Sequence, residues 1–217
     1  MFLNDKKPII ACATGATGNT AIAVIRISGF SDVNAFKSSF LTKKLLKPRH
    51  AIFTKIVEGN IIFDECILLY FKGPHSFTGE DTLELQVHGN QLNVQRIIKH
   101  FTQRYDLREA KAGEFAYRAM INNKLSMSQV EGLEILLNAQ SEYGLTQGVD
   151  LLGGEIHQAF LSLRESFLKI KTAIELLIDF SEDVGEENAK NLFLEGRNEF
   201  SQKISELNSR AAINAAD

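Results

Sequence analysis

The sequence is 217 residues long, with 44% hydrophobic and 24% charged residues, a composition typical of globular chains with one large or two small domains. The net charge of -3 argues against a surface dedicated to nucleic acid, although a local basic patch is compatible with it. Because no apolar run approaches the roughly 18 residues of a membrane span and no signal-peptide core is present, we expect a cytoplasmic protein without a membrane anchor.

The first half of the sequence predicts several strands. Apolar runs over residues 8–13 and 20–28 indicate two of them, and the second is so apolar that both of its faces should be covered. A hairpin should follow, with strands over 49–57 and 61–71 joined by a turn at 58–60.

Two helices accompany these strands. Ser31 is a suitable N-cap for the first helix. Apolar residues at helical spacing mark one face of the second: Val94, Ile97, Ile98, Phe101 and Tyr105. Strands and helices in no regular alternation predict an α+β domain with a largely antiparallel or mixed sheet.

The most distinctive stretch is GPHSFTGEDTLELQVHG, at residues 73–89. A polar loop containing Gly79 leads into a strand over 82–88 in which polar and apolar residues alternate strictly, so that Glu84, Gln86 and His88 share one face. This polar row either faces bulk water or lines a small-molecule pocket built on a rigid strand.

Three further features have two readings each. Arg26 interrupts an apolar strand and requires an anionic partner, which is either an internal carboxylate or a ligand. Gly15 and Gly18 form a turn rather than a phosphate cradle, because the P-loop pattern is absent from the sequence. Cys12 and Cys66 are expected to be buried free thiols of a reducing compartment, not a disulfide or a metal pair.

Helical patterns replace strand patterns from about residue 115. Ser126 and Gln129 fit a capping box. Apolar residues spaced three or four apart from Leu145 to Leu177 form a long seam with a weak point at Gly153–Gly154, and a returning antiparallel helix follows. We therefore expect an α+β domain over 1–115 and a helical domain over 116–217.

Four segments resemble the N-terminal region of the MnmE/TrmE family of tRNA-modifying GTPases. They are VIRISG at 24–29, GPHSFTGEDTLELQVHG at 73–89, GEFAYRAMINNKLSMSQVE at 113–131 and IDFSED at 178–183. Their order and spacing match the family across nearly the whole chain. The resemblance implies an N-terminal domain that binds a tetrahydrofolate derivative (5-formyl- or methylene-tetrahydrofolate) and forms a homodimer.

The resemblance also implies a helical domain that carries an inserted P-loop G domain. In this family the enzyme works with an FAD-dependent partner, MnmG (GidA), to build an aminomethyl-type group on the wobble uridine of tRNA. The folate is expected to supply the one-carbon unit. GTP, Mg and K belong to the G domain, which these 217 residues lack, so we expect no GTP hydrolysis from them.

Residue by residue, the resemblance assigns folate binding to Arg26, Glu84 and Lys124. A carboxylate can accept hydrogen bonds from the donors of a pterin edge, and basic side chains suit the anionic glutamate tail. Which of Arg26 and Lys124 contacts which end of the folate stays open. No metal ligands and no catalytic residue are expected in the chain.

The sequence departs from the family pattern beside the expected pocket, at Asn19, Asn90 and 111–112. These departures support a second hypothesis, a dimerisation and docking scaffold with a degenerate folate pocket. A third hypothesis is a stand-alone folate-dependent transferase, for which His88 and Glu84 are the nearby acid–base candidates.

Overall fold

The computed structural model describes residues 5–15, 18–42, 44–179 and 186–214. The chain divides into two compact units, Met1–Leu125 and Ser126–Asp217, which are considered separately below. The sequence-based boundary at residue 115 differs from this division because buried Glu114 and Arg118 bond α2 (Glu114–Ile121) to Arg108 of the sheet and to the loop residue Glu80. Of the IDFSED segment, Phe180 to Asp183 lie outside the described residues.

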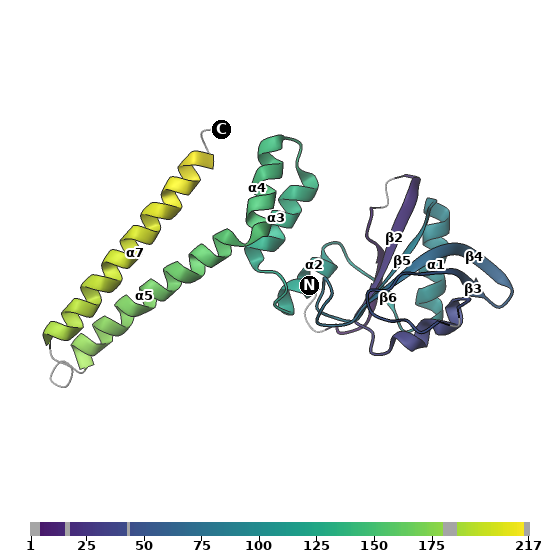
Figure 1. The fold of residues 1–217 in the computed structure, drawn as a ribbon, viewed down its shortest axis with the longest axis horizontal. Coiled ribbons are helices and arrows are strands. Elements are labelled where there is room, and N and C mark those ends of the chain that lie inside the picture. The colour runs from purple at the N-terminus through teal and green to yellow at the C-terminus, as the bar shows by residue number, and fades with distance from the viewer. Residues whose placement is uncertain (1–4, 16–17, 43, 180–185, 215–217) are drawn as a thin grey trace. The chain divides into compact units, whose positions relative to one another are not determined.

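A mixed sheet of six strands organises the first unit (Figure 1). Its strands are β1 (Ile9–Cys12), β2 (Thr20–Ser28), β3 (Ile52–Glu58), β4 (Ile61–Phe71), β5 (Thr82–Gly89) and β6 (Arg108–Glu109), in the spatial order β3-β4-β5-β2-β1-β6. Neighbouring strands are antiparallel except β1 and β6, which are parallel. The α+β class is thus confirmed.

One face of the sheet is packed against α1 (Gln91–Arg104), whose first turn is capped by the Asn90 side chain. The buried core between them combines residues of both layers. Its central members are Ile25, Ile27, Leu83, Leu85, Val94, Ile97 and Phe101. The helical face predicted from the apolar spacing is the one that is buried, because only that stripe of the helix is apolar.

A short 3-10 helix, η1 (Val33–Ser39), stands where the first helix was expected. Its cap is Asp32, not Ser31: the Asp32 carboxylate accepts a hydrogen bond from the backbone N–H of Asn34 at 2.8 Å. The prediction of a Ser31 cap was therefore wrong by one residue, since both side chains suit the role.

The opposite face of the sheet is open over much of its area. The strand registers place Phe53, Ile67, Gln86 and Val24 in one row across four strands. A second row contains Leu69, Glu84, Arg26 and Ala11. Ile22 on β2 is 61% exposed, and Ile67 on neighbouring β4 is 39% exposed, so β2 is not covered on both faces within this chain, contrary to the prediction. We call this surface the open face.

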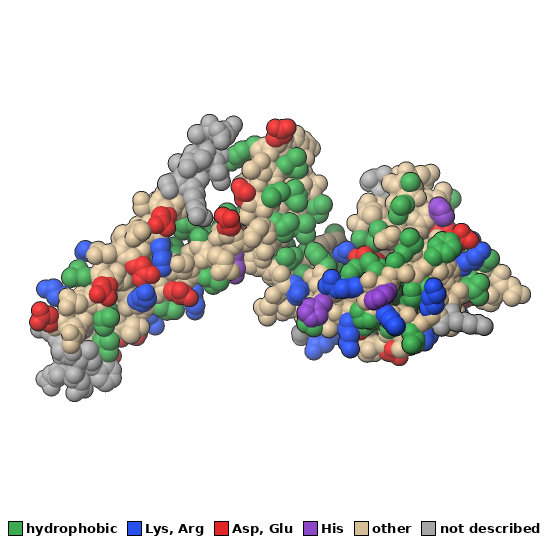
Figure 2. Space-filling view, viewed as in Figure 1, with side chains coloured by type: hydrophobic (Ala, Val, Ile, Leu, Met, Phe, Trp, Pro, Cys, Tyr) green, Lys and Arg blue, Asp and Glu red, His purple; other side chains and the backbone are tan. Residues whose placement is uncertain are grey.

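The second unit begins with a helical hairpin of α3 (Met127–Asn138) and α4 (Glu142–Gly153). The predicted capping box of Ser126 and Gln129 is present. The two helices approach closely at glycines, because a Cβ on Gly148 would lie 2.7 Å from the backbone nitrogen of Leu136. Hydrophobic side chains remain at the surface of this hairpin (Figure 2).

The predicted run of apolar residues from Leu145 to Leu177 does not form one helix but is divided between α4 and α5 (Glu155–Asp179). The break is at Gly154, which caps α4 in a left-handed conformation with a φ of 82°. The expected returning helix is α7 (Glu186–Asn214), which runs antiparallel to α5 (Figure 1). The pair buries little apolar surface: Phe160 is 58% and Phe167 53% exposed. No described helix is long and apolar enough to cross a membrane.

Candidate functional site

Arg26 and Glu84 lie opposite each other on β2 and β5 and form an ion pair on the open face. The Nε and Nη2 atoms of Arg26 both lie 2.8 Å from Oε1 of Glu84. The side chains are 21% and 16% exposed, so the pair is largely shielded from water. Among the described residues, Oε2 of Glu84 has no hydrogen-bond partner. This leaves one carboxylate oxygen available as an acceptor.

Two aromatic rings flank the Arg26 guanidinium. Its Cζ lies 5.1 Å from the centre of the Phe77 ring and 5.4 Å from that of Phe115. Both distances are within the range of cation–π contacts. Phe77 belongs to the loop over 73–81 and Phe115 to α2, so the guanidinium joins the sheet to both of these elements.

Lys124 approaches the same loop from the end of α2. The stem of its side chain lies against Gly79, where an added Cβ would be 3.1 Å from Cγ of Lys124. The amide of Asn122 donates to the carbonyl oxygen of Thr78 at 2.7 Å, which fastens this end of α2 to the loop. Arg26 and Lys124 therefore both lie against the loop over 73–81, and Glu84 is bonded to Arg26, but no described contact joins Lys124 to the Arg26–Glu84 pair.

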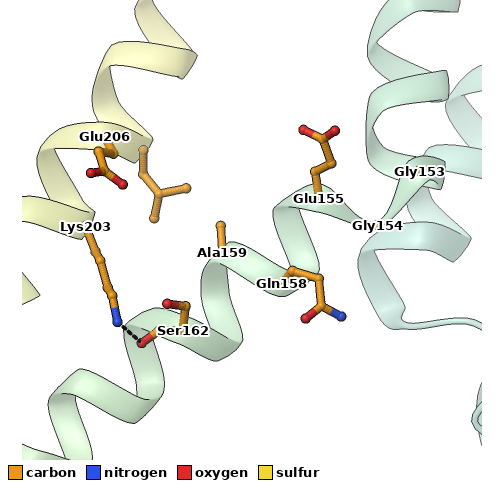
Figure 3. A pocket seen from close by; sticks show the side chains of 9 residues that line it. Gly153, Gly154, Glu155, Gln158, Ala159, Ser162, Lys203 and Glu206 are labelled. Carbon is orange, nitrogen blue, oxygen red and sulfur yellow. Dashed lines mark hydrogen bonds between the residues drawn. The ribbon is translucent and has the colours of Figure 1, made fainter.

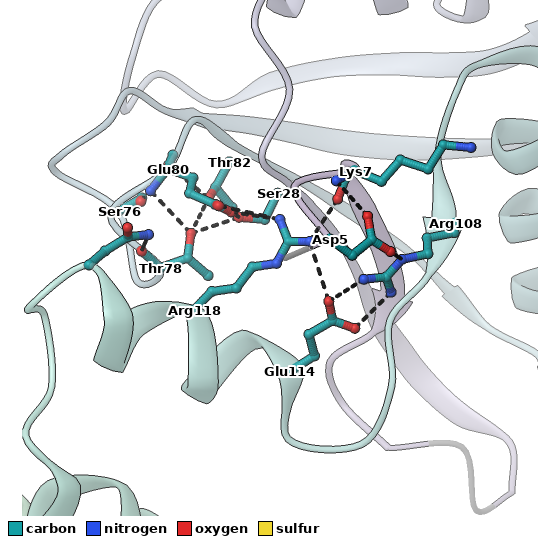
Figure 4. A network of polar contacts seen from close by, with 11 residues as sticks. Asp5, Lys7, Ser28, Ser76, Thr78, Glu80, Thr82, Arg108, Glu114 and Arg118 are labelled. Carbon is teal, nitrogen blue, oxygen red and sulfur yellow. Dashed lines mark hydrogen bonds and ion pairs between the residues drawn. The ribbon is translucent and has the colours of Figure 1, made fainter. Parts of the chain in front are cut away.

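A network of buried polar side chains fixes α2 to the loop (Figure 4). Arg118, only 3% exposed, contacts both carboxylate oxygens of Glu80 at 3.2 and 3.3 Å. Oε2 of Glu80 accepts from the hydroxyl of Ser28, which lies 2.7 Å from that of Thr78. Arg118 also donates to the carbonyl oxygen of Lys7 at 2.7 Å. Two residues of the loop that contains Phe77 are thus tied to β2, namely Thr78 and Glu80, and Glu80 is also tied to α2.

The network continues to Arg108, which forms two hydrogen bonds of 2.6 and 2.8 Å with the carboxylate of Glu114. Hydrogen bonding to Arg108 holds the pKa of Glu114 down at about 2, despite the burial of the carboxylate. Glu114 and Arg118 are four residues apart on a helix, a spacing that allows a contact between them. That spacing was the available sequence signal for this network, but Glu80 and Arg108 could not be joined to it from the sequence.

His88 is held by a different carboxylate. Its Nδ1 lies 2.7 Å from Oδ1 of Asp64, and its backbone N–H donates to Oδ2 at 2.9 Å. The hydrogen bond to Asp64 raises the pKa of His88 above its ordinary value. His88 and Glu84, four residues apart on an extended strand, are separated by roughly 13 Å along β5. The structure thus provides no acid–base pair of His88 and Glu84.

Several cavities lie away from the ion pair, among them two with distinct surroundings. One, of about 470 Å³, lies between α5 and α7; there the ammonium of Lys203 donates to the carbonyl oxygen of Ser162 (Figure 3). The other, of about 270 Å³, lies between the β1–β2 turn and α1 and contains Cys12, which is partly exposed, not buried as expected. Cys66 is buried, and burial raises the pKa of its thiol to about 12. Neither cavity contains a predicted site residue.

The described residues contain no cluster of His, Cys, Asp and Glu suited to a metal ion. The arrangement around Glu84 instead offers one acceptor oxygen, a guanidinium and an aromatic ring on rigid elements. Such a site can bind and orient a ligand with donor groups at its edge. It has no described nucleophile placed beside a base.

Residues 8–124, more than half of the chain, match the model of the family described as "GTP-binding protein TrmE N-terminus". The chain belongs to this family. The TrmE match ends at Lys124 and so includes Arg26, Glu84 and the side chains of the network on α2, the loop and β6, although not Lys7.

Individual TrmE relatives extend the match into the helical unit. The chain is 41% identical over 178 residues to the tRNA modification GTPase MnmE of Francisella philomiragia, covering 82% of the chain and 39% of the relative. It is 40% identical over 178 residues to the tRNA modification GTPase MnmE of Francisella tularensis subsp. holarctica strain LVS, with the same coverage. The chain therefore spans about two fifths of the length of the relatives it matches.

Proposed function

We propose that the first unit binds a reduced folate, such as 5-formyl-tetrahydrofolate, on the open face beside the loop over 73–81. The observation that carries the proposal is the free Oε2 of Glu84, held by β5 and largely shielded from water. A pterin edge presents neighbouring N–H donors that suit a carboxylate oxygen. Membership of the TrmE family supports the same ligand class through the resemblance at Arg26, Glu84 and Lys124.

The Arg26–Glu84 ion pair is compatible with this ligand. Because both bonds from Arg26 go to Oε1, a ligand donor can use Oε2 without breaking the pair. Lys124, whose ammonium has no described partner, is available for an anionic tail.

In the wider context, we propose that this chain is the folate-binding, dimerising region of a tRNA modification GTPase. Its partners would be a second copy of the chain, an FAD-dependent MnmG protein and, through that complex, tRNA. The product would carry an aminomethyl-type group on the wobble uridine, with the one-carbon unit from the folate. A cytoplasmic location and a G domain elsewhere in the protein, with its GTP, Mg and K, are parts of this proposal.

Self-association is supported by apolar side chains that the monomer leaves exposed, such as Ile22 and Phe53 on the open face and Phe167 on α5. A sheet face with this exposure is unusual for a monomer unless another surface covers it. Sedimentation at micromolar concentration is expected to give a dimer, and a monomer near 24.2 kDa would contradict this part of the proposal.

Calorimetric titration with 5-formyl-tetrahydrofolate tests the folate proposal. Saturable binding of one ligand per chain is expected, and GTP should give no binding heat to this chain. A folate titration without binding would favour the second candidate, a dimerisation and docking scaffold. That candidate is supported by the internal partner of Arg26 and by the departures at Asn19, Asn90 and 111–112.

A further inference from the structure

Phe77 is an exposed aromatic ring in a loop that is otherwise tied down. The residue is 38% exposed, whereas Thr78 beside it is completely buried. Single exposed apolar residues are common and require no explanation by themselves. Phe77 differs from such residues because its loop is rigidly bonded on both sides of the ring and because it borders a shielded ion pair.

The bonds that hold the loop come from within the loop and from β2, β4 and the end of α2. On the N-terminal side of the ring, the Ser76 hydroxyl donates to the carbonyl oxygen of Glu80 at 2.5 Å. On the C-terminal side, Thr78 is bonded to Ser28 through its hydroxyl and to Asn122 through its carbonyl. Asp81 closes the loop by accepting from the backbone N–H of Gly73 and from the Tyr70 hydroxyl. The position of the Phe77 ring is thereby fixed before any ligand arrives.

The surroundings of the ring define what could lie against it. The guanidinium of Arg26 lies 5.1 Å from the ring centre, and Arg26 in turn holds Oε1 of Glu84. Because Arg26 contacts both the Phe77 ring and Oε1 of Glu84, a molecule that donates a hydrogen bond to Oε2 lies one side chain away from the ring. A flat heteroaromatic ring with N–H groups along one edge satisfies both surfaces at once, by stacking and by hydrogen bonding.

We propose that Phe77 is the stacking wall of the site and binds the flat heterocycle of the ligand whose edge Glu84 accepts. This inference rests on the proposed folate site and adds a binding residue to it. Phe77 stacks on the flat pyrimidine ring of the reduced pterin, and Glu84 accepts from the donor edge of that same ring. The rigid loop lowers the entropic cost of stacking, because the ring is already ordered.

A pair of matched substitutions tests the proposal by calorimetry with 5-formyl-tetrahydrofolate. Phe77→Leu keeps an apolar side chain but removes the aromatic surface, so affinity should fall roughly tenfold, as for loss of one stacking contact. Phe115→Leu removes the other ring beside Arg26, at 5.4 Å, and should cause a clearly smaller loss. Equal losses in both variants would mean that Phe77 acts only through Arg26, and would overturn the proposal.

The absence of tryptophan from the sequence allows a spectroscopic test. Phe77→Trp introduces a single fluorophore at the proposed wall, and Phe53→Trp introduces one at an exposed position of β3, on the same face. Folate should change the emission of the Trp at position 77 saturably, with the dissociation constant found by calorimetry. The Trp at position 53 should not report that transition.

The outcomes separate this inference from the proposed function. If the wild-type chain binds no folate, the proposed function fails and Phe77 fails with it. If the wild-type chain binds folate while Phe77→Leu binds equally well, or the Trp at position 77 gives no saturable signal, the folate site stands and the stacking role is refuted. Circular dichroism of each variant shows whether it is folded.

Discussion

Replacing Glu84 by Gln is the sharpest single test of how the site recognises its ligand. The amide keeps the size of the side chain but carries one oxygen in place of two. In the wild-type chain, Arg26 donates to Oε1 of Glu84. In the variant we expect Arg26 to donate to the amide oxygen in the same place, so that the NH2 group takes the position of Oε2. That group is a donor and faces the donors of the pterin edge.

The magnitude follows from the lost contact. A hydrogen bond to a charged group contributes about 1.5–3 kcal/mol, which corresponds to a loss of affinity of about tenfold to a hundredfold. The weaker pair with Arg26, at 21% and 16% exposure, should also lower the free energy of unfolding by about 1 kcal/mol. The variant is expected to remain folded.

Calorimetry with 5-formyl-tetrahydrofolate and thermal unfolding together give both quantities. Glu65→Gln is the matched control, because Glu65 lies on neighbouring β4 and forms an exposed ion pair of 2.9 Å with Lys55. It should bind folate like the wild-type chain. Unchanged binding by Glu84→Gln, or an equal loss in Glu65→Gln, would refute the assignment of Glu84.

Three further predictions concern the fold. Glu114→Gln should lower the free energy of unfolding at pH 7 by about 3 kcal/mol. Because the folded state lowers the pKa of Glu114, the ionised carboxylate stabilises the fold above about pH 4.5, and this contribution is lost as the pH falls to about 2. Denaturant titrations of the variant at several pH values should therefore lack this loss of stability in acid. Asp64→Asn should return the raised pKa of His88 to its ordinary value in an NMR titration; a still raised value would exclude Asp64 as the cause. Gly148→Ala should lower the melting temperature, since its Cβ would lie 2.7 Å from the Leu136 backbone; an unchanged value would mean that α3 and α4 separate at little cost.

The strands could be predicted where a long run of residues with high strand propensity marked them in the sequence. The bounds of β2 and β4 agree with the predicted runs because both strands are long and rich in β-branched or aromatic residues. The capping box at Ser126 was predictable because it is a local exchange of hydrogen bonds. By contrast, β6 has only two residues and pairs with β1 across most of the domain, so no local pattern indicates it.

The candidate site could be predicted only in part, because its contacts join distant segments. Because Arg26 interrupts an apolar strand, the sequence predicted that its guanidinium has an anionic partner. The alternation of polar and apolar residues over 82–88 predicted that Glu84 lies on the polar face of its strand. Their pairing depends on the register of β2 and β5, 58 residues apart in sequence. The exposure of Phe77 could not be predicted, since it follows from bonds that Asn122 and Ser28 make to the neighbouring residue.

A crystal structure of the chain with 5-formyl-tetrahydrofolate is the most direct test of the central claim. The account predicts the pterin edge within hydrogen-bond distance of Oε2 of Glu84, the ring system against Phe77, and the Arg26 bond to Oε1 preserved. Folate bound elsewhere, or bound without a contact to Oε2 of Glu84, would contradict it.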